Sequence, residues 1–318
     1  MKGITNFFDR VVQRYLPDAF LFAVILTLVV FVMGIFFTSS STLEMVSYWG
    51  DGFWDLLAFA MQMSLIVVTG YILANTPVVK GGLERISRLA NTPGQAIVLI
   101  TIVTIIACWI NYGFGLVVGA LLAVHIVKRV PSVDYRLLVA SAYSGFLVWH
   151  GGLSASAPLL VATEGHFLED TIGTIPVVNT LFSPFNLFIV IVFLVTLPAL
   201  NWLLMKSRGP VTIEQQPWNF QEEEKVEEAS AEEMTPASRL ENSMILSLLV
   251  GALGVVYIVY HFVQNGFDLN LNIVIFTFLL LGILLHRTPK QFLGSVTDSV
   301  KNVGGIIIQF PFYAGLWV

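Results

Sequence analysis

The stretch that decides the fold is Gln95–Val127, QAIVLITIVTIIACWINYGFGLVVGALLAVHIV, which contains no Lys, Arg, Asp or Glu. A single helix of this length would be about 50 Å long, whereas the hydrocarbon core of a bilayer is about 30 Å thick. The polar, glycine-containing sequence Asn111-Tyr112-Gly113-Phe114-Gly115 interrupts it. We therefore expect a segment that enters the membrane, turns at depth and returns, which is a re-entrant hairpin.

The basic residues around this stretch support a hairpin. Six of them flank it closely: Lys80, Arg85 and Arg88 before it, and Lys128, Arg129 and Arg136 after it. The positive-inside bias predicts that both flanks are cytoplasmic. With a hairpin, all sixteen Lys and Arg can lie inside. With a single crossing at Asn111, the six before it would lie inside and the ten after it outside, so the bias favours the hairpin.

The composition indicates a polytopic membrane protein. The chain has 318 residues, of which 56% are hydrophobic and only 12% are charged. A soluble domain carries about twice that charged fraction. The net charge of −5 gives no indication of a nucleic-acid partner. We therefore expect an all-α polytopic fold in a lipid bilayer, with a re-entrant hairpin and a broken helix.

The apolar segments are predicted to form two membrane repeats. The first, residues 1–205, should contain spans at about 19–38 and 53–74, the hairpin at 95–127, a broken span at 137–163 and a span at 186–205. Residues 206–242, with seven Glu between 222 and 233, should form an acidic cytoplasmic linker. Residues 243–318 repeat the order of span, return span, basic amphipathic helix and glycine-containing segment, so we interpret them as an incomplete second repeat.

The relative orientation of the repeats stays open. Four crossings before the linker would make them parallel, whereas one more, near Thr171–Phe182, would make them inverted. Three basic residues near the start, Lys2, Arg10 and Arg14, predict a cytoplasmic N-terminus.

The candidate substrate-binding residues lie where the apolar segments are interrupted. No Lys or Arg lies within any apolar segment, so an anionic substrate would need backbone N–H groups, hydroxyls and amides. These are offered by Asn111, Tyr112, Gly113 and Gly115 at the hairpin tip, and by Gly151, Gly152, Ser154 and Ser156 in the broken span. The alternative is that these small residues only allow close helix packing.

His150 is the candidate for a coupling proton, because it lies beside the broken span and titrates near neutral pH. A neighbouring carbonyl that satisfies its ring is the alternative. Oxygen atoms around Asn111 could instead hold Na⁺, so the coupling ion is left as H⁺ or Na⁺.

An enzyme is not expected from this sequence. The string GLSAS at 152–156 is not the G-x-S-x-G pattern of hydrolases, and no acid at that depth could orient His150. The five His and one Cys show no metal-ligand spacing. No phosphate-binding loop is present either, so neither a metal nor another cofactor is expected.

Four strings are distinctive: WGDGFWDLLAF at 49–59, INYGFGLVVGA at 110–120, GGLSASAPL at 151–159 and QFPFYAG at 309–315. They resemble the bacterial short-chain fatty acid transporters, and the resemblance covers the whole chain. It implies uptake of carboxylates such as acetoacetate or butyrate across the inner membrane. It also implies a fold like that of the ion-transporter superfamily, with paired re-entrant hairpins around the substrate. Family members are longer, so we expect this chain to be C-terminally truncated relative to them.

The sequence therefore predicts an ion-gradient-driven secondary transporter for short-chain monocarboxylates. The alternative is a truncated, non-transporting remnant or one subunit of a split carrier. A homo-oligomer is left open.

Overall fold

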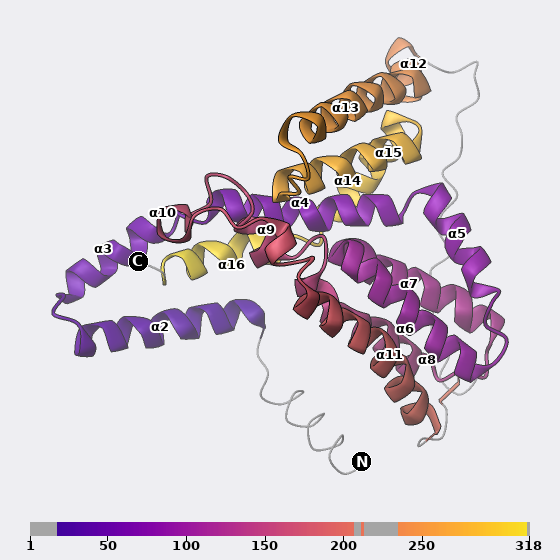
Figure 1. Cartoon of the computed structure of the whole chain (residues 1–318), viewed down its shortest axis with the longest axis horizontal. Helices are drawn as coiled ribbons and strands as arrows, with labels where there is room; N and C mark the ends of the chain where they lie inside the picture. The colour runs from indigo at the N-terminus through magenta and orange to yellow at the C-terminus, as the bar shows by residue number, and fades with distance from the viewer. Residues whose placement is uncertain (1–17, 207–210, 213–234, 317–318) are drawn as a thin grey trace. The chain divides into compact units, whose positions relative to one another are not determined.

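The computed structural model describes residues 18–206, 211–212 and 235–316, and within these ranges it is helical without any strand (Figure 1). Six helices here are long and apolar enough to cross a membrane: α2 (Ala19–Phe37), α4 (Leu57–Ala74), α6 (Pro93–Ile110), α7 (Tyr112–Arg129), α11 (Pro184–Lys206) and α13 (Met244–Asn265). Two apolar helices are shorter, α14 (Leu271–His286) and α16 (Gly304–Ala314). The prediction of an all-α protein with several spans is confirmed.

A threonine followed by a proline begins four of the described helices, α5 (Pro77–Ser87), α6, α12 (Pro236–Glu241) and α15 (Pro289–Val300). In each, the Thr hydroxyl accepts a hydrogen bond from an N–H group of the first turn. The proline that follows has no N–H to satisfy there, so the pair is a strong start signal.

The chain divides into two compact units, one within residues 1–64 and 302–318 and the other within 65–301. The first unit contains α2, α3 (Thr42–Gly52) and α16. Its centre is aromatic: the ring of Phe312 lies edge-on to those of Phe20, Trp49 and Phe53 at centroid distances of 5.2, 6.1 and 5.9 Å. These contacts pack α16 against α2 and α3.

The second unit is built around α6. This helix packs against α7, α8 (Tyr135–Ser144), α11 and the 3₁₀ helix η1 (Gly145–Gly151), and Figure 1 shows the α-helices side by side. The core contains side chains with no exposed surface: Ile97, Ile100, Leu122, Ile126 and Leu138. Because helices in a bilayer are held together by close van der Waals packing, this core fixes the elements that carry the candidate site.

Helices α13 and α14 also belong to the second unit and form an antiparallel pair. Gly251 of α13 lies against Leu284 of α14, and Gly254 lies against Leu280. The residue numbers of the contacts thus increase along α13 and decrease along α14. A Cβ at either glycine would overlap the leucine side chain, which explains why this close crossing needs glycine.

Helix α5 has one apolar side and one polar side. Its apolar side, with Leu83 buried, packs on α7. Its polar side carries Glu84, whose carboxylate accepts a hydrogen bond of 2.8 Å from Arg88. That bond lowers the pKa of Glu84.

Two further expectations concern the linker and a possible extra crossing. Most of the predicted acidic linker, 206–242, lies outside the described residues, although α12 (Pro236–Glu241) lies at its end. Near 171–182, the site considered for an extra crossing, the structure has only α10 (Glu169–Ile172) and the 3₁₀ helix η2 (Val177–Asn179). Neither is long enough to span a membrane.

Candidate functional site

Helices α6 and α7 are joined by the single non-helical residue Asn111 and form a hairpin. Asn111 is extended, with φ −157° and ψ 124°. Gly115 packs on Cys108, and a Cβ on Gly119 would lie 2.9 Å from Thr104, so the two limbs run antiparallel. At the open end, the Arg129 guanidinium donates to the carbonyl of Ala90 and the side chain of Asn91 at 3.3 and 3.1 Å. The limbs therefore stay paired along their length.

The tip of this hairpin lies against the middle of α4. The side chain of Asn111 is fully buried, and its Nδ2 atom donates to the carbonyl of Ile66 at 3.4 Å. A Cβ on Gly113 would lie 2.9 Å from Cα of Val67. Because α4 runs from Leu57 to Ala74, the tip contacts it about halfway along its length.

Asn111 also organises the start of α7. Its Oδ1 atom accepts a hydrogen bond of 2.9 Å from the N–H of Phe114, which makes it the N-cap of that helix. The same amide thus caps α7 and binds α4. This accounts for a polar side chain at a buried turn, since an unpaired amide there would be costly.

The broken segment is in direct contact with the tip. The N–H of Tyr112 donates to Oγ of Ser154 at 2.9 Å, and the N–H of Leu153 donates to the carbonyl of Trp109 at 2.7 Å. Ser154 has no exposed surface. A Cβ on Gly152 would lie 2.8 Å from Cα of Trp109, so glycine is needed for this approach. The structure thus brings together the two interruptions that the sequence singled out.

The break itself is formed by a change of helix type. Helix α8 ends at Ser144, η1 follows to Gly151, Gly152 is extended with φ −112° and ψ 179°, and a short helix, α9, begins at Ser156 and ends at Leu160. Sequence reasoning missed the residue that holds this break. Asn186 of α11 donates from Nδ2 to the carbonyl of Gly151 at 3.0 Å. An asparagine in the first turn of an apolar helix was the available signal.

The candidate residues play unequal parts in this arrangement. Asn111, Tyr112 and Ser154 make polar contacts between elements, whereas Gly113, Gly115 and Gly152 permit close packing. Gly151 lies beside Asn186, and Ser156 is half-buried at the start of α9. The N–H groups of Tyr112, Phe114 and Gly115 already have acceptors within the chain. As it stands, the tip is therefore a closed contact rather than an open anion site.

His150 lies apart from these buried contacts. Its side chain is exposed, and its ring is 3.7 Å from the Trp149 ring between centroids. Within the described residues, no group of three or more His, Cys, Asp or Glu could hold a metal ion.

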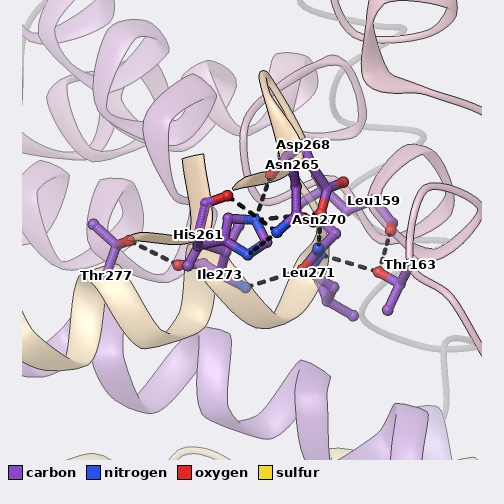
Figure 2. Close-up of polar contacts among 9 residues, drawn as sticks. All are labelled: Leu159, Thr163, His261, Asn265, Asp268, Asn270, Leu271, Ile273 and Thr277. Carbon is purple, nitrogen blue, oxygen red and sulfur yellow. Dashed lines mark hydrogen bonds and ion pairs between the residues drawn. The ribbon is translucent and has the colours of Figure 1, made fainter. Parts of the chain in front are cut away.

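Two further polar contacts tie the break and α4 to α14, and neither was predicted. The N–H of Leu271, at the start of α14, donates to Oγ1 of Thr163 at 3.1 Å, as Figure 2 shows. At the other end, Nε2 of His286 lies 2.9 Å from the carbonyl of Ile72. Near the C-terminal end of α4 the N–H of Thr76 bonds to Leu73 instead, so His286 satisfies a carbonyl that the helix end leaves available.

Together with the contacts at the tip, these two hydrogen bonds connect the broken segment, α14, α4 and the hairpin in a closed sequence of contacts within the second unit. From Ser154 the chain runs through α9 to Thr163, across to α14, back through His286 to α4, and through Ile66 to the tip at Asn111. All are hydrogen bonds of neutral groups or an imidazole. The groups that meet at the tip contact are a hydroxyl, an amide and backbone N–H groups, and they are paired with one another.

Comparison with known proteins supports the same class. The family profile for short chain fatty acid transporters matches residues 1–318. A protein of Escherichia coli (strain K12), named as a proposed short-chain fatty acid transporter, is 45% identical over 314 residues, which cover 98% of this chain and 71% of that protein. A protein of the same description from Haemophilus influenzae is 40% identical and is covered to 72%. No solved structure gives a significant match.

Spans, hairpin and whole-chain similarity agree on a membrane transporter and not an enzyme. The chain therefore belongs to the short chain fatty acid transporter family.

Proposed function

We propose that this protein takes up short-chain monocarboxylates, such as acetoacetate or butyrate, across the bacterial inner membrane by symport with an ion. The observation that carries the proposal is the contact between Tyr112 N–H and Ser154 Oγ. It places the N-terminal end of α7, which carries a partial positive charge, against a buried hydroxyl.

Substrate binding would replace this contact. When the broken segment moves away from the tip, the N–H of Tyr112 and the hydroxyl of Ser154 become two donors that face the same space. A carboxylate can accept from both. Because the binding groups are neutral, release needs no strong ion pair to be broken.

The depth of the tip follows from α4 under this proposal. If α4 crosses the bilayer, the contact with Ile66 puts the tip near the midplane, where secondary transporters bind substrate. Each limb has 18 residues and is therefore about 27 Å long. The limbs then have to be tilted, or their ends have to emerge from the bilayer on the side where their basic flanks lie. We propose that this side is the cytoplasm and that the N-terminus lies on it too.

The coupling ion is either H⁺ or Na⁺. His150, whose side chain is exposed, is the proposed proton acceptor. Carbonyl and amide oxygens near Asn111 are the proposed Na⁺ ligands. Uptake driven separately by a pH gradient and by a Na⁺ gradient distinguishes them.

The alternative is a subunit of a split carrier, or a remnant without transport activity. The chain spans 71% and 72% of the two relatives. Counterflow of labelled butyrate in liposomes that contain only this chain separates the two ideas, with formate-loaded and empty liposomes as controls. Saturable counterflow supports a carrier, whereas its absence in correctly inserted protein supports the alternative.

A further inference from the structure

A cleft lies at the turn between α13 and α14, away from the hairpin tip. It consists of two adjoining cavities of about 450 and 560 Å³, which share His261, Asn270 and Asn272 as lining residues. All lining residues belong to the second unit. We call this site the α13–α14 cleft.

Hydrogen bonds hold one wall of the cleft in place (Figure 2). Nε2 of His261 lies 2.9 Å from the carbonyl of Asp268 and 3.2 Å from its carboxylate. Nδ2 of Asn265 lies 3.3 Å from Nδ1 of His261, and Nδ2 of Asn270 donates to Asp268 at 2.8 Å. With Asn265 donating to Nδ1, the proton of a neutral ring is on Nε2, where it meets Asp268.

The cleft has an apolar end and a polar end. Tyr257, Ile273 and Phe276 line the smaller cavity, and the rings of Tyr257 and Phe276 are in edge contact at 5.1 Å. The larger cavity is lined by hydroxyls, amides and acids, among them Thr163 and Glu164. A ligand with a short alkyl body and one polar head matches both ends, and each cavity has a volume in the range of small-molecule sites.

The charged groups that line the cleft determine which protonation state of the ligand's polar head can bind. The titratable groups that line the cleft are the acids Glu164 and Asp268, the phenol Tyr257, and His261, which is paired with Asp268; none of the described lining residues is Lys or Arg. Two carboxylates repel a carboxylate ligand. Amides both donate and accept, as the O–H and C=O of an undissociated carboxylic acid require.

We propose that the α13–α14 cleft is an outer docking site for the undissociated form of short-chain carboxylic acids. The inference rests on the proposed function for its substrate class. The basic residues Arg287 and Lys290 lie at the opposite end of α14, so their predicted cytoplasmic position puts the cleft on the outer face. The ligand carries its proton from the medium into the cleft, and no covalent bond changes.

The cleft connects directly to the candidate site. Thr163, which lines it, accepts the hydrogen bond from the N–H of Leu271 and lies just beyond α9, the helix that follows Ser154. The segment that lines the cleft is therefore continuous with the segment that closes the hairpin tip.

The test is ligand-observed saturation-transfer NMR of butyrate with the full chain in lipid nanodiscs at about pH 5 and about pH 7.5. Carboxylic acids titrate near pH 4–5, so we expect butyrate to bind at least about tenfold more tightly at the lower pH. 1-Butanol, which has the same chain length but does not titrate in this range, should bind equally at both values.

Two variants locate the signal. Asn272→Leu removes an exposed lining amide, whereas Asn272→Gln keeps it, so only the first should weaken butyrate binding. Ser154→Leu should abolish uptake yet leave this binding intact. The proposal is overturned if butyrate binds no more tightly at low pH, if butanol shows the same pH dependence, if Asn272→Leu has no effect, or if Ser154→Leu removes the signal. Uptake that survives Ser154→Leu would instead contradict the proposed tip site alone.

Discussion

Ser154 caps a helix that belongs to another part of the chain: its Oγ atom accepts the N–H of Tyr112 at 2.9 Å, forty-two residues earlier in the sequence. Each element supplies what the other lacks. The start of α7 has N–H groups without helical partners, and the break between α8 and α9 has a hydroxyl that can accept one of them. If transport requires this contact to open, substitutions here should affect uptake more than membrane insertion.

Ser154→Leu tests the contact by bulk. Ser154 has no exposed surface, and overpacking such a site costs about 1–3 kcal/mol. We expect uptake of labelled butyrate to be abolished while the protein is still inserted. Ala157→Leu, which places the same side chain at an exposed position of α9, should transport normally. Normal uptake by Ser154→Leu would exclude this site.

Asn111→Ala removes both the cap of α7 and the donor to Ile66. Loss of an N-cap costs about 0.5–2 kcal/mol, and the unpaired carbonyl adds to this. We expect a lower thermal unfolding temperature in detergent and reduced uptake. Asn179→Ala, at an exposed position, is the matched control. Equal unfolding temperatures for the two variants would show that the buried amide is not structural.

Gly115→Ala should force the limbs of the hairpin apart. The added Cβ would overlap backbone and side-chain atoms of Cys108, which cannot move independently of α6. We expect destabilisation of about 1–3 kcal/mol. Gly81→Ala in α5 meets no atom within 4 Å and should instead stabilise by about 0.5–1 kcal/mol. Chemical denaturation of both proteins gives the comparison, and the same sign for both would argue against close limb packing.

His286→Phe should loosen the connection between α14 and α4. The carbonyl of Ile72 would lose the donor that lies 2.9 Å away, at a cost of about 1–3 kcal/mol for a buried unsatisfied group. His286→Gln, whose amide can still donate, should retain most of the stability. Hydrogen exchange of the last turn of α4 reports the difference. Equal protection in both variants would mean that the contact does not stabilise this helix end.

The interruptions of the apolar segments could be predicted from the sequence. The hydrogen bonds that satisfy the polar groups at these interruptions could be predicted only in part. A polar, glycine-containing string in a charge-free run has few structural solutions in a membrane, so the turn at Asn111 and the break at Gly151–Ser156 were both predictable. The parts played by Asn186 and His286 were not. Each acts through one contact with a carbonyl that is distant in sequence, at Gly151 and Ile72, and such a contact leaves no local pattern.

The roles of the glycines could likewise not be predicted fully from the sequence. Gly113 and Gly115 were predicted to offer backbone N–H groups to a substrate, with close packing as the alternative. In the structure a Cβ at either position would meet Val67 or Cys108. Sequence alone does not distinguish the two uses, because both need a residue without a side chain.

The most direct test of the account is cysteine labelling of the hairpin's two ends in intact cells, in a Cys108→Ala background. Leu89 and Ser132 are both exposed and precede and follow the hairpin. The account predicts that cysteines at these two positions react only from the cytoplasmic side. If one reacted from the cytoplasm and the other from the periplasm, the two limbs would not be a returning hairpin, and the contact between Tyr112 and Ser154 could not form as described.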